Sequence, residues 1–300
     1  MDRSSKAGEV GEKQMEKVEK LSLMAIFAHP DDESFGNGGT LAKYGEEGVF
    51  TSLLCATRGE AGEISDPALA TPDNLGQVRE QELRLACSIL GIQDLRFLGY
   101  VDGTLGGIDQ EECTRRMVRA IRELKPQVIF TFGPEGVYGH PDHIAVSQMA
   151  TDAFHMAGDS SAFPEHFREG LKPWASLKLY YVAPPRERFK RMGERTAQLV
   201  PHTAWTSRDW DTFGVPEANI TTCVEVGRYV DTKLAAIAAH QTQIPEDHPY
   251  ALLPRDVLRE FFREECYVLA ESRVGPPQGR ETDLFARVGE AAPAPARAED

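Results

Sequence analysis

The stretch LSLMAIFAHPDDESFGNGG, residues 21–39, decides the fold. Its apolar run at 21–28 suits a buried strand and is well short of the roughly 18 apolar residues that a membrane span needs. One histidine and three acidic residues follow this run within positions 29–33. Because neighbouring carboxylates repel one another, the cluster is either a solvated turn or a place where a cation lies among the side chains.

Apolar runs alternate with amphipathic segments along most of the chain. Helical patterns lie at 75–91, 110–126 and 140–154, and the first of them ends on Gly91. Alternation of this kind, with nearly continuous apolar strands, predicts a mostly parallel sheet with helices on both faces. We therefore expect an α/β, three-layer Rossmann-like fold. Its strands are expected in the apolar runs at 21–28, 49–57, 94–99, 127–132, 176–183 and 220–226.

The pattern weakens at both ends and in two internal stretches. Residues 1–20 and 273–300 lack apolar periodicity, so we expect a disordered N-terminal tail and a flexible C-terminal tail. Residues 21–272 are expected to form a single domain. Within it, the Pro-, Gly- and Arg-rich segments 158–175 and 184–217 are expected to be long loops.

Composition excludes several kinds of partner. The formal net charge of −14 argues against nucleic acid and anionic membranes, which are polyanions. The mixed charge ahead of the first strand is unlike the basic start of a signal peptide, so a cytoplasmic protein without integral membrane contact is expected. The cysteines form no CxxC pair and are interpreted as small apolar core residues, not as a disulfide framework or thiolate metal site. They are Cys55, Cys87, Cys113, Cys223 and Cys266.

A second cluster, HPDH at 140–143, follows the apolar run at 127–132. Because parallel sheets bind ligands at the carboxyl ends of their strands, both clusters are expected at the same edge. Either cluster alone could be a capped helix start, but the two together favour a metal site. A His, Asp and His set suits zinc, although iron(II) binds the same kind of ligands. His29, Asp32 and His143 would suffice, which leaves Asp31 and His140 free to move protons.

The sequence also allows three other interpretations. A dinucleotide-binding loop needs a glycine at position 41, where Leu41 stands, so the nearby glycines are expected to let the backbone turn beside the metal. A non-haem iron oxygenase fits poorly with the strand–helix alternation. A non-catalytic, metal-stabilised binding protein stays open, although a structural zinc is normally closed by a fourth protein ligand.

The two clusters resemble the signatures of the PIG-L/LmbE-like superfamily of N-acetylglucosaminyl deacetylases, the GlcNAc-phosphatidylinositol de-N-acetylases. AHPDDE at 28–33 and HPDH at 140–143 are both intact. The resemblance extends over roughly residues 21–272 and includes ATRGEAGE (56–63), FLGYVDGTL (97–105) and KLAAIAAHQTQ (233–243).

This resemblance implies a zinc-dependent hydrolase that removes acetyl from an N-acetylglucosamine-containing conjugate. It implies that Asp31 is the general base and that His140, in its protonated form, stabilises the oxyanion or protonates the leaving amine. The metal ligands that it implies are His29, Asp32 and His143.

The resemblance also assigns supporting residues. Asp142 would set the charge of His140, and Tyr138 would assist the tetrahedral intermediate. Arg79, Asp102 and Glu60 would hold the sugar. From the residues alone, Arg79 is equally an exposed position on an amphipathic helix, and Asp102 stands in an ordinary Asp-Gly turn.

The substrate is expected to be a small soluble conjugate, since no basic amphipathic anchor is present. An amidase acting on mycothiol S-conjugates at the same site is the alternative, and a homo-oligomer is possible. His240 is interpreted as a cation at a helix C-terminus, outside the site. The tryptophans of the two expected loops would suit a sugar ring, although tryptophan packs into cores as often. They are Trp174, Trp205 and Trp210.

Overall fold

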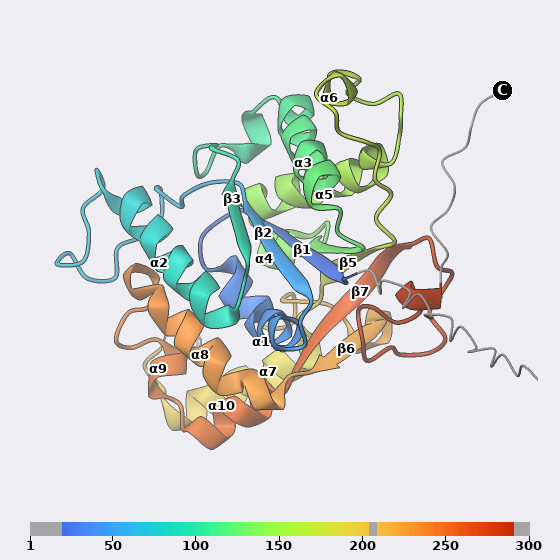
Figure 1. Cartoon of the computed structure of the whole chain (residues 1–300). Helices are drawn as coiled ribbons and strands as arrows, with labels where there is room; N and C mark the ends of the chain where they lie inside the picture. Colours follow the sequence, from blue (N-terminus) through green and yellow to red (C-terminus); the bar gives the residue numbers. More distant parts are fainter. Residues whose placement is uncertain (1–19, 204–208, 291–300) are drawn as a thin grey trace, which may run out of the picture.

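The computed structural model describes residues 20–203 and 209–290, which share one seven-stranded sheet with the order β3-β2-β1-β4-β5-β7-β6 (Figure 1). The first five strands run parallel, while β7 is antiparallel to both of its neighbours. This mostly parallel sheet confirms the predicted α/β class. The strands are β1 (Ser22–Phe27), β2 (Phe50–Cys55), β3 (Asp94–Phe97), β4 (Val128–Phe132), β5 (Lys178–Val182), β6 (Thr222–Glu225) and β7 (Glu264–Ser272).

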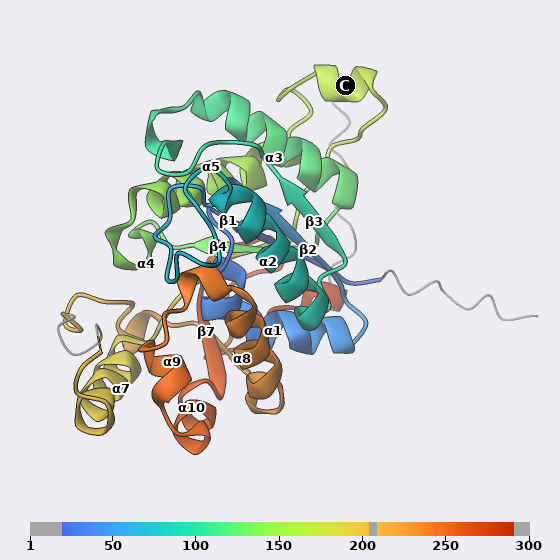
Figure 2. The same ribbon diagram turned by 90° about the vertical axis from the view of Figure 1, so that its left-hand side faces the viewer.

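Helices cover both faces of the sheet. On one face α3 (Gln110–Leu124) packs against α5 (Pro141–Ala157), and on the other α1 (Asp32–Glu46) and α2 (Leu75–Leu90) pack against α8 (Val230–Ala239) (Figure 1). Turning the molecule shows α7 (Arg186–Leu199), α9 (Pro249–Leu252) and α10 (Arg255–Phe261) gathered far from α3 and α5 (Figure 2). Two further short helices are α4 (Gly136–Gly139) and α6 (Glu165–Arg168).

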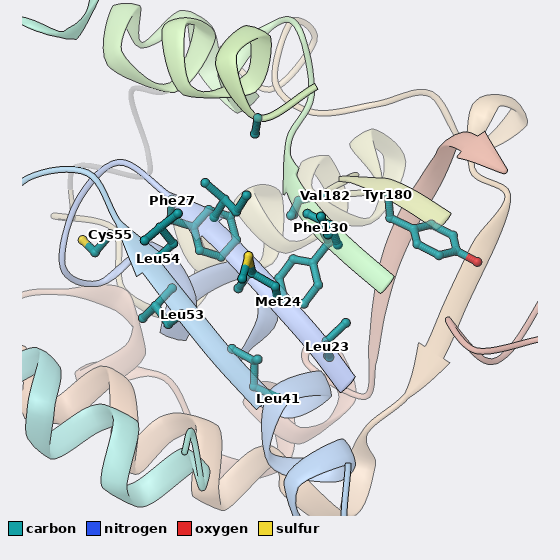
Figure 3. Close-up of a cluster of buried hydrophobic side chains, with 14 of the residues drawn as sticks. Leu23, Met24, Phe27, Leu41, Leu53, Leu54, Cys55, Phe130, Tyr180 and Val182 are labelled. Carbon is teal, nitrogen blue, oxygen red and sulfur yellow. The ribbon is translucent and has the colours of Figure 1, made fainter. Parts of the chain in front are cut away.

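The core forms around β1, whose six residues are all buried. Because a central strand of a covered sheet has no solvent face, its sequence is continuously apolar instead of alternating. Phe27 packs against Phe130 and Phe132 of β4, with ring centroids 5.7 and 4.9 Å apart. Phe27 and Phe130 are labelled among the buried side chains of the sheet in Figure 3. Within the described residues, no helix has both the length and the apolar character that a membrane crossing requires.

The glycines after the first cluster have a role different from the one expected. They lie inside α1, where they allow close packing instead of a turn. A Cβ on Gly39 would meet Val226 at 2.7 Å. The turn itself falls on Asp31, before the helix begins. Small residues on this face of α1 therefore let the helix lie close to the segment after β6.

Two expected irregular segments are structured. The predicted loop 184–217 contains α7, which Phe189 and Met192 anchor in a second apolar cluster against α10. Part of the expected C-terminal tail is also packed, because Leu284 is fully buried in the main core and the Tyr44 hydroxyl donates to Asp283. Both expectations were wrong for the same reason. When a segment has only a few apolar residues among charged ones, its burial cannot be recognised until the distant residues that it packs against are known. Residues 1–19, most of the expected N-terminal tail, and residues 291–300, the end of the expected C-terminal tail, lie outside the described part.

The interpretation of all cysteines as unpaired core residues was also wrong. Cys223 on β6 and Cys266 on β7 are direct cross-strand partners and form a disulfide. Their separation of 43 residues hides this pairing until β6 and β7 are aligned. The remaining three cysteines are buried and free.

The disulfide gives a simple chemical prediction. An alkylating reagent applied to the denatured, unreduced protein is expected to label three cysteines, and all five after reduction. Intact mass spectrometry counts the adducts. Cys223→Ser is the matched control, because it should leave every remaining cysteine reactive without reduction. Labelling of all cysteines in the unreduced wild-type protein would contradict the pairing.

Candidate metal centre and active site

The two predicted clusters meet at the carboxyl end of the sheet. His29 lies two residues after β1, Asp31 directly precedes α1, and Asp32 is the first residue of α1. His143 lies in the first turn of α5, which follows β4 through α4. Since β1 and β4 are adjacent and parallel, residues more than 100 positions apart in sequence come together at one edge.

Three side chains direct ligand atoms toward one another. His143 Nε2 lies 3.3 Å from His29 Nδ1 and 3.4 Å from Asp32 Oδ1, and His29 Nδ1 lies 3.6 Å from Asp32 Oδ2. A tetrahedral ion with metal–nitrogen bonds of about 2.0–2.1 Å holds its ligand atoms about 3.3 Å apart. The spacing and the donor types therefore fit a metal such as zinc.

The other nitrogen of His29 is held by two carboxylates. Nε2 lies 2.9 Å from Asp102 Oδ1 and 3.3 Å from Asp142 Oδ2. A proton on Nε2 leaves the lone pair on Nδ1, and metal-binding histidines are commonly oriented in this way. His143 is fixed differently, because its ring stacks on Phe132 with centroids 3.9 Å apart.

The electrostatics of the site favour positive charge. Burial by itself lowers the pKa of His29, but hydrogen bonds to Asp102 and Asp142 outweigh burial and raise it to about 10. Burial, together with the charge of His29, lowers the pKa of His143 to about 3. The same excess of carboxylates would favour a metal cation in place of a proton on His29 Nδ1. Such a cation would offset the charges of Asp32, Asp102 and Asp142, which surround the His29 ring.

Asp31 stands beside this group without belonging to it. Its backbone has φ 114° and ψ −28°, and its carbonyl accepts the first N–H groups of α1, from Ser34 and Phe35. Its carboxylate receives Arg79 Nη2 at 3.0 Å. Burial raises the pKa of Asp31 to about 6, although the nearby Arg79 opposes the shift. The carboxylate is thus close to the metal ligands and poised to exchange a proton near neutrality.

Arg79 is not the exposed helix residue that the amphipathic pattern allowed. Its side chain is 3% exposed and donates to the carbonyls of Pro30 and Gly59 as well as to Asp31. Gly59 is required there, because it has φ +66° and a Cβ would lie 2.2 Å from Arg79 Nη1. The arginine therefore fixes the loop that carries Asp31.

The second cluster is arranged partly as expected. His140 caps α5, with its Nδ1 accepting the Asp142 N–H at 3.2 Å, and its ring centroid lies 4.6 Å from that of His143. The Asp142 carboxylate, however, accepts from the N–H groups of Gly103 and Leu105 and faces His29. The expected control of His140 by this carboxylate is therefore replaced by contacts that orient His29.

A pocket of about 310 Å³ opens beside the metal-ligand group. Asp31, Asp32 and His143 line it, together with the half-exposed Tyr138. Most of its remaining wall is apolar and aromatic. The aromatic lining residues are Phe27, Phe35, Phe132, Phe189, Trp210, Phe213, His248 and Tyr250.

Several predicted substrate-binding residues lie elsewhere. Arg79, Asp102 and Glu60 do not line this pocket. Asp102 is engaged with His29 and the Ala61 N–H, and Glu60 accepts the Arg58 N–H within its own turn.

The three tryptophans have different positions. Trp210 lines the pocket, whereas Trp174 donates to the Pro126 carbonyl and packs against the main core. Trp205 lies outside the described residues. Among the tryptophans that the structure describes, Trp210 is therefore the one that a ligand in this pocket would contact.

One buried pair was missed. His240, expected to complement a helix end, is fully buried, and its Nε2 lies 2.7 Å from Glu33 Oε1. Burial by itself would raise the pKa of Glu33 and lower that of His240, but their contact has the opposite effect and shifts both pKa values the other way. Nothing local in the sequence signals this contact, because the two residues are 207 positions apart.

Two histidines and an aspartate at the rim of an α/β sheet, with a further carboxylate beside them, are the kind of site that metal-dependent hydrolases use. Comparisons with known proteins agree with this class of site. Residues 24–154 match the family model of PIG-L, GlcNAc-PI de-N-acetylase. The chain belongs to the PIG-L family, as the sequence motifs had indicated.

Similarity to individual relatives extends well beyond that match. The 1D-myo-inositol 2-acetamido-2-deoxy-alpha-D-glucopyranoside deacetylase of Thermobispora bispora is 36% identical over 89% of this chain and 98% of its own length. The protein of the same name from Streptomyces avermitilis is 37% identical, over 90% and 98% of the two chains.

A solved structure supports the fold. The N,N'-diacetylchitobiose deacetylase of Pyrococcus horikoshii superposes with a TM-score of 0.63 over 83% of each chain. Its sequence identity to this chain is 20%, so this likeness concerns the fold alone.

Proposed function

We propose that this protein is a metal-dependent deacetylase that removes the acetyl group from the 2-acetamido sugar of a GlcNAc–inositol conjugate. The observation that carries the proposal is the placement of Asp31 beside the His29, Asp32 and His143 group, in the wall of a largely aromatic pocket. The two deacetylases described above, similar over nearly their whole length, support the choice of substrate.

His29, Asp32 and His143 would hold the metal, for which zinc is the first choice and iron(II) the second. Such an ion, when bound, lowers the pKa of its water to about 7 and polarises the substrate carbonyl. Asp102 and Asp142 would keep His29 in the tautomer whose Nδ1 can act as a ligand.

The protein's own groups would move the protons. Asp31 accepts a proton from the attacking water, and Arg79 holds Asp31 in place. His140 would donate a hydrogen bond from Nε2 to the developing oxyanion, because its Nδ1 accepts the Asp142 N–H. The proton that Asp31 takes from the water would then pass to the leaving amine. The half-exposed Tyr138 lines the same pocket and would hydrogen-bond the developing oxyanion.

The aromatic wall would receive the ring that carries the acetamido group or the ring attached to it. The hydrophobic faces of sugar rings and cyclitols pack well on aromatic side chains. Most of this wall, including Val182, Phe189 and Trp210, comes from residues after 154, outside the segment that matches the family model. Substrate choice within the family would therefore depend on the C-terminal half of the chain.

A substrate panel tests the proposal. Released acetate is measured for the GlcNAc–inositol conjugate, N-acetylglucosamine and N,N'-diacetylchitobiose, and released amine for amide-linked mycothiol S-conjugates. Acetate release from the GlcNAc–inositol conjugate at the highest kcat/KM, lost in metal-free protein and restored by zinc, is expected. Turnover of the S-conjugates alone would favour the amidase alternative. Stoichiometric metal without any turnover would favour a binding protein.

Trp210→Ala is expected to raise KM for the conjugate about 3- to 10-fold with little change in kcat, because an aromatic contact contributes roughly 0.5–1.5 kcal/mol. Steady-state kinetics measure the change. Trp174→Ala is the matched control, since Trp174 does not line the pocket. Equal KM values for both variants and the wild-type protein would remove Trp210 from the binding surface.

A further inference from the structure

The buried pair of Glu33 and His240 lies next to Asp31, and neither residue lines the pocket. We propose that the pair is a positioning unit, which holds Asp31 in the one orientation that lets its carboxylate reach the attacking water. The inference rests on the proposed role of Asp31 as the base. It adds Glu33 and His240 to the groups on which the reaction depends, although neither would touch the substrate.

Asp31 needs such support because of its backbone. A residue with a side chain rarely adopts φ 114° and ψ −28°, and a conformation of this kind persists only where surrounding contacts impose it. Two contacts flank the strained residue: its N–H donates to Glu33 Oε2 at 3.0 Å, and its carboxylate receives Arg79. Glu33 thus fixes the main chain, while Arg79 fixes the side chain.

Glu33 can hold the main chain only while its own carboxylate is stable in the interior. It is 1% exposed, and a buried carboxylate without partners is strongly unfavourable. His240 Nε2 contacts Glu33 Oε1 at 2.7 Å, and the Ser34 hydroxyl donates to the same oxygen. These two contacts leave Glu33 Oε2 to accept from Asp31.

The histidine comes from a distant part of the chain. It follows α8, which packs beside α1 (Figure 1). Its hydrogen-bond partner in the site is Glu33, and it belongs to neither group of candidate metal ligands. The hydrogen-bond path from His240 to Asp31 therefore runs through Glu33. This places one control on catalysis in the C-terminal half, after the segment 24–154 that matches the family model.

The test compares His240→Leu, which removes the donor, with His240→Gln, whose amide can still donate to Glu33. His240→Leu is expected to lower kcat about 10- to 100-fold, since a base displaced by about 1 Å loses rate on this scale. KM and the zinc content per chain should stay at wild-type values. His240→Gln should recover most of the lost kcat. If His240→Leu does not fold, His240→Asn replaces it, because its shorter amide falls short of Glu33.

A double-mutant cycle separates positioning from general stability. If His240 acts through Glu33, adding His240→Leu to Glu33→Gln should reduce kcat by less than twofold beyond Glu33→Gln alone. Lys178→Met is the matched control, because it breaks another buried ion pair, with Glu281 at 2.9 Å, at the opposite end of the sheet. This control should unfold more easily and keep its kcat.

The outcomes are distinguishable from failure of the proposed function. If His240→Leu keeps wild-type kcat while Asp31→Asn is inactive, the positioning unit is overturned and the role of Asp31 stands. Loss of zinc from His240→Leu would also overturn it, since the pair would then support the metal group. If Asp31→Asn remains active, the proposed function itself fails.

Discussion

Asp31→Asn is expected to lower kcat about 10²- to 10⁴-fold, the usual contribution of a positioned general base. The amide keeps the size of the side chain and can still accept a hydrogen bond from Arg79, but it cannot take a proton from water. Because Asp31 is not among the three candidate ligands, zinc content should remain at one ion per chain. Acetate release and elemental analysis of the same preparation measure both properties.

The matched control for this prediction is Asp73→Asn. Asp73 is exposed, outside the pocket and the ligand groups, so the same chemical change should leave kcat and zinc content at wild-type values. Wild-type turnover by Asp31→Asn would exclude Asp31 as the base. Loss of zinc from Asp31→Asn would instead make this carboxylate a ligand.

His143→Ala is expected to weaken zinc binding by more than about 100-fold. Loss of a residue that only hydrogen-bonds to a metal ligand weakens metal binding by up to about 100-fold, and loss of a ligand itself should cost more. It removes one of the three donors and leaves His29 Nδ1 and Asp32 without the nitrogen that lies 3.3–3.4 Å from them. Acetate release at micromolar zinc should disappear. Competition with a chelating dye measures the affinity.

His155→Ala is the control for this variant, because His155 lies on the same helix, α5, with a half-exposed side chain. It should bind zinc as the wild-type protein does. Wild-type zinc affinity in His143→Ala would show that the metal is held elsewhere. Rescue of His143→Ala by raised zinc concentration, with turnover restored, would support the assignment, since the base Asp31 is still present.

Much of the fold was predictable because it depends on local patterns. The apolar runs of β1 and β4 are continuous, and strands of this kind pair in parallel under covering helices. The helix α7 was not predictable in the same way, since its buried face needs α10 to be recognised. The disulfide between Cys223 and Cys266 required the alignment of β6 and β7.

The same distinction between local patterns and long-range contacts applies to the site. The clusters at 28–33 and 140–143 could be brought together from sequence, because parallel strands deliver their carboxyl ends to one edge. The contact partners of each side chain could not be predicted from the sequence. Arg79, which the sequence pattern allowed as an exposed helix residue, is buried and supports Asp31. His240 contacts Glu33, which lies in a distant part of the chain. Such contacts depend on packing between segments far apart in the chain.

The central claim is that one metal lies among His29, Asp32 and His143, and the two faces of the His29 ring make it directly testable. Nδ1 faces Asp32 and His143, while Nε2 faces Asp102 and Asp142, a second group whose ligand atoms are also close together. Anomalous diffraction at the zinc edge from crystals of the zinc-loaded protein distinguishes them. We predict a single peak about 2.0–2.1 Å from His29 Nδ1 and His143 Nε2. A peak bonded to His29 Nε2, between Asp102 and Asp142, would contradict the account.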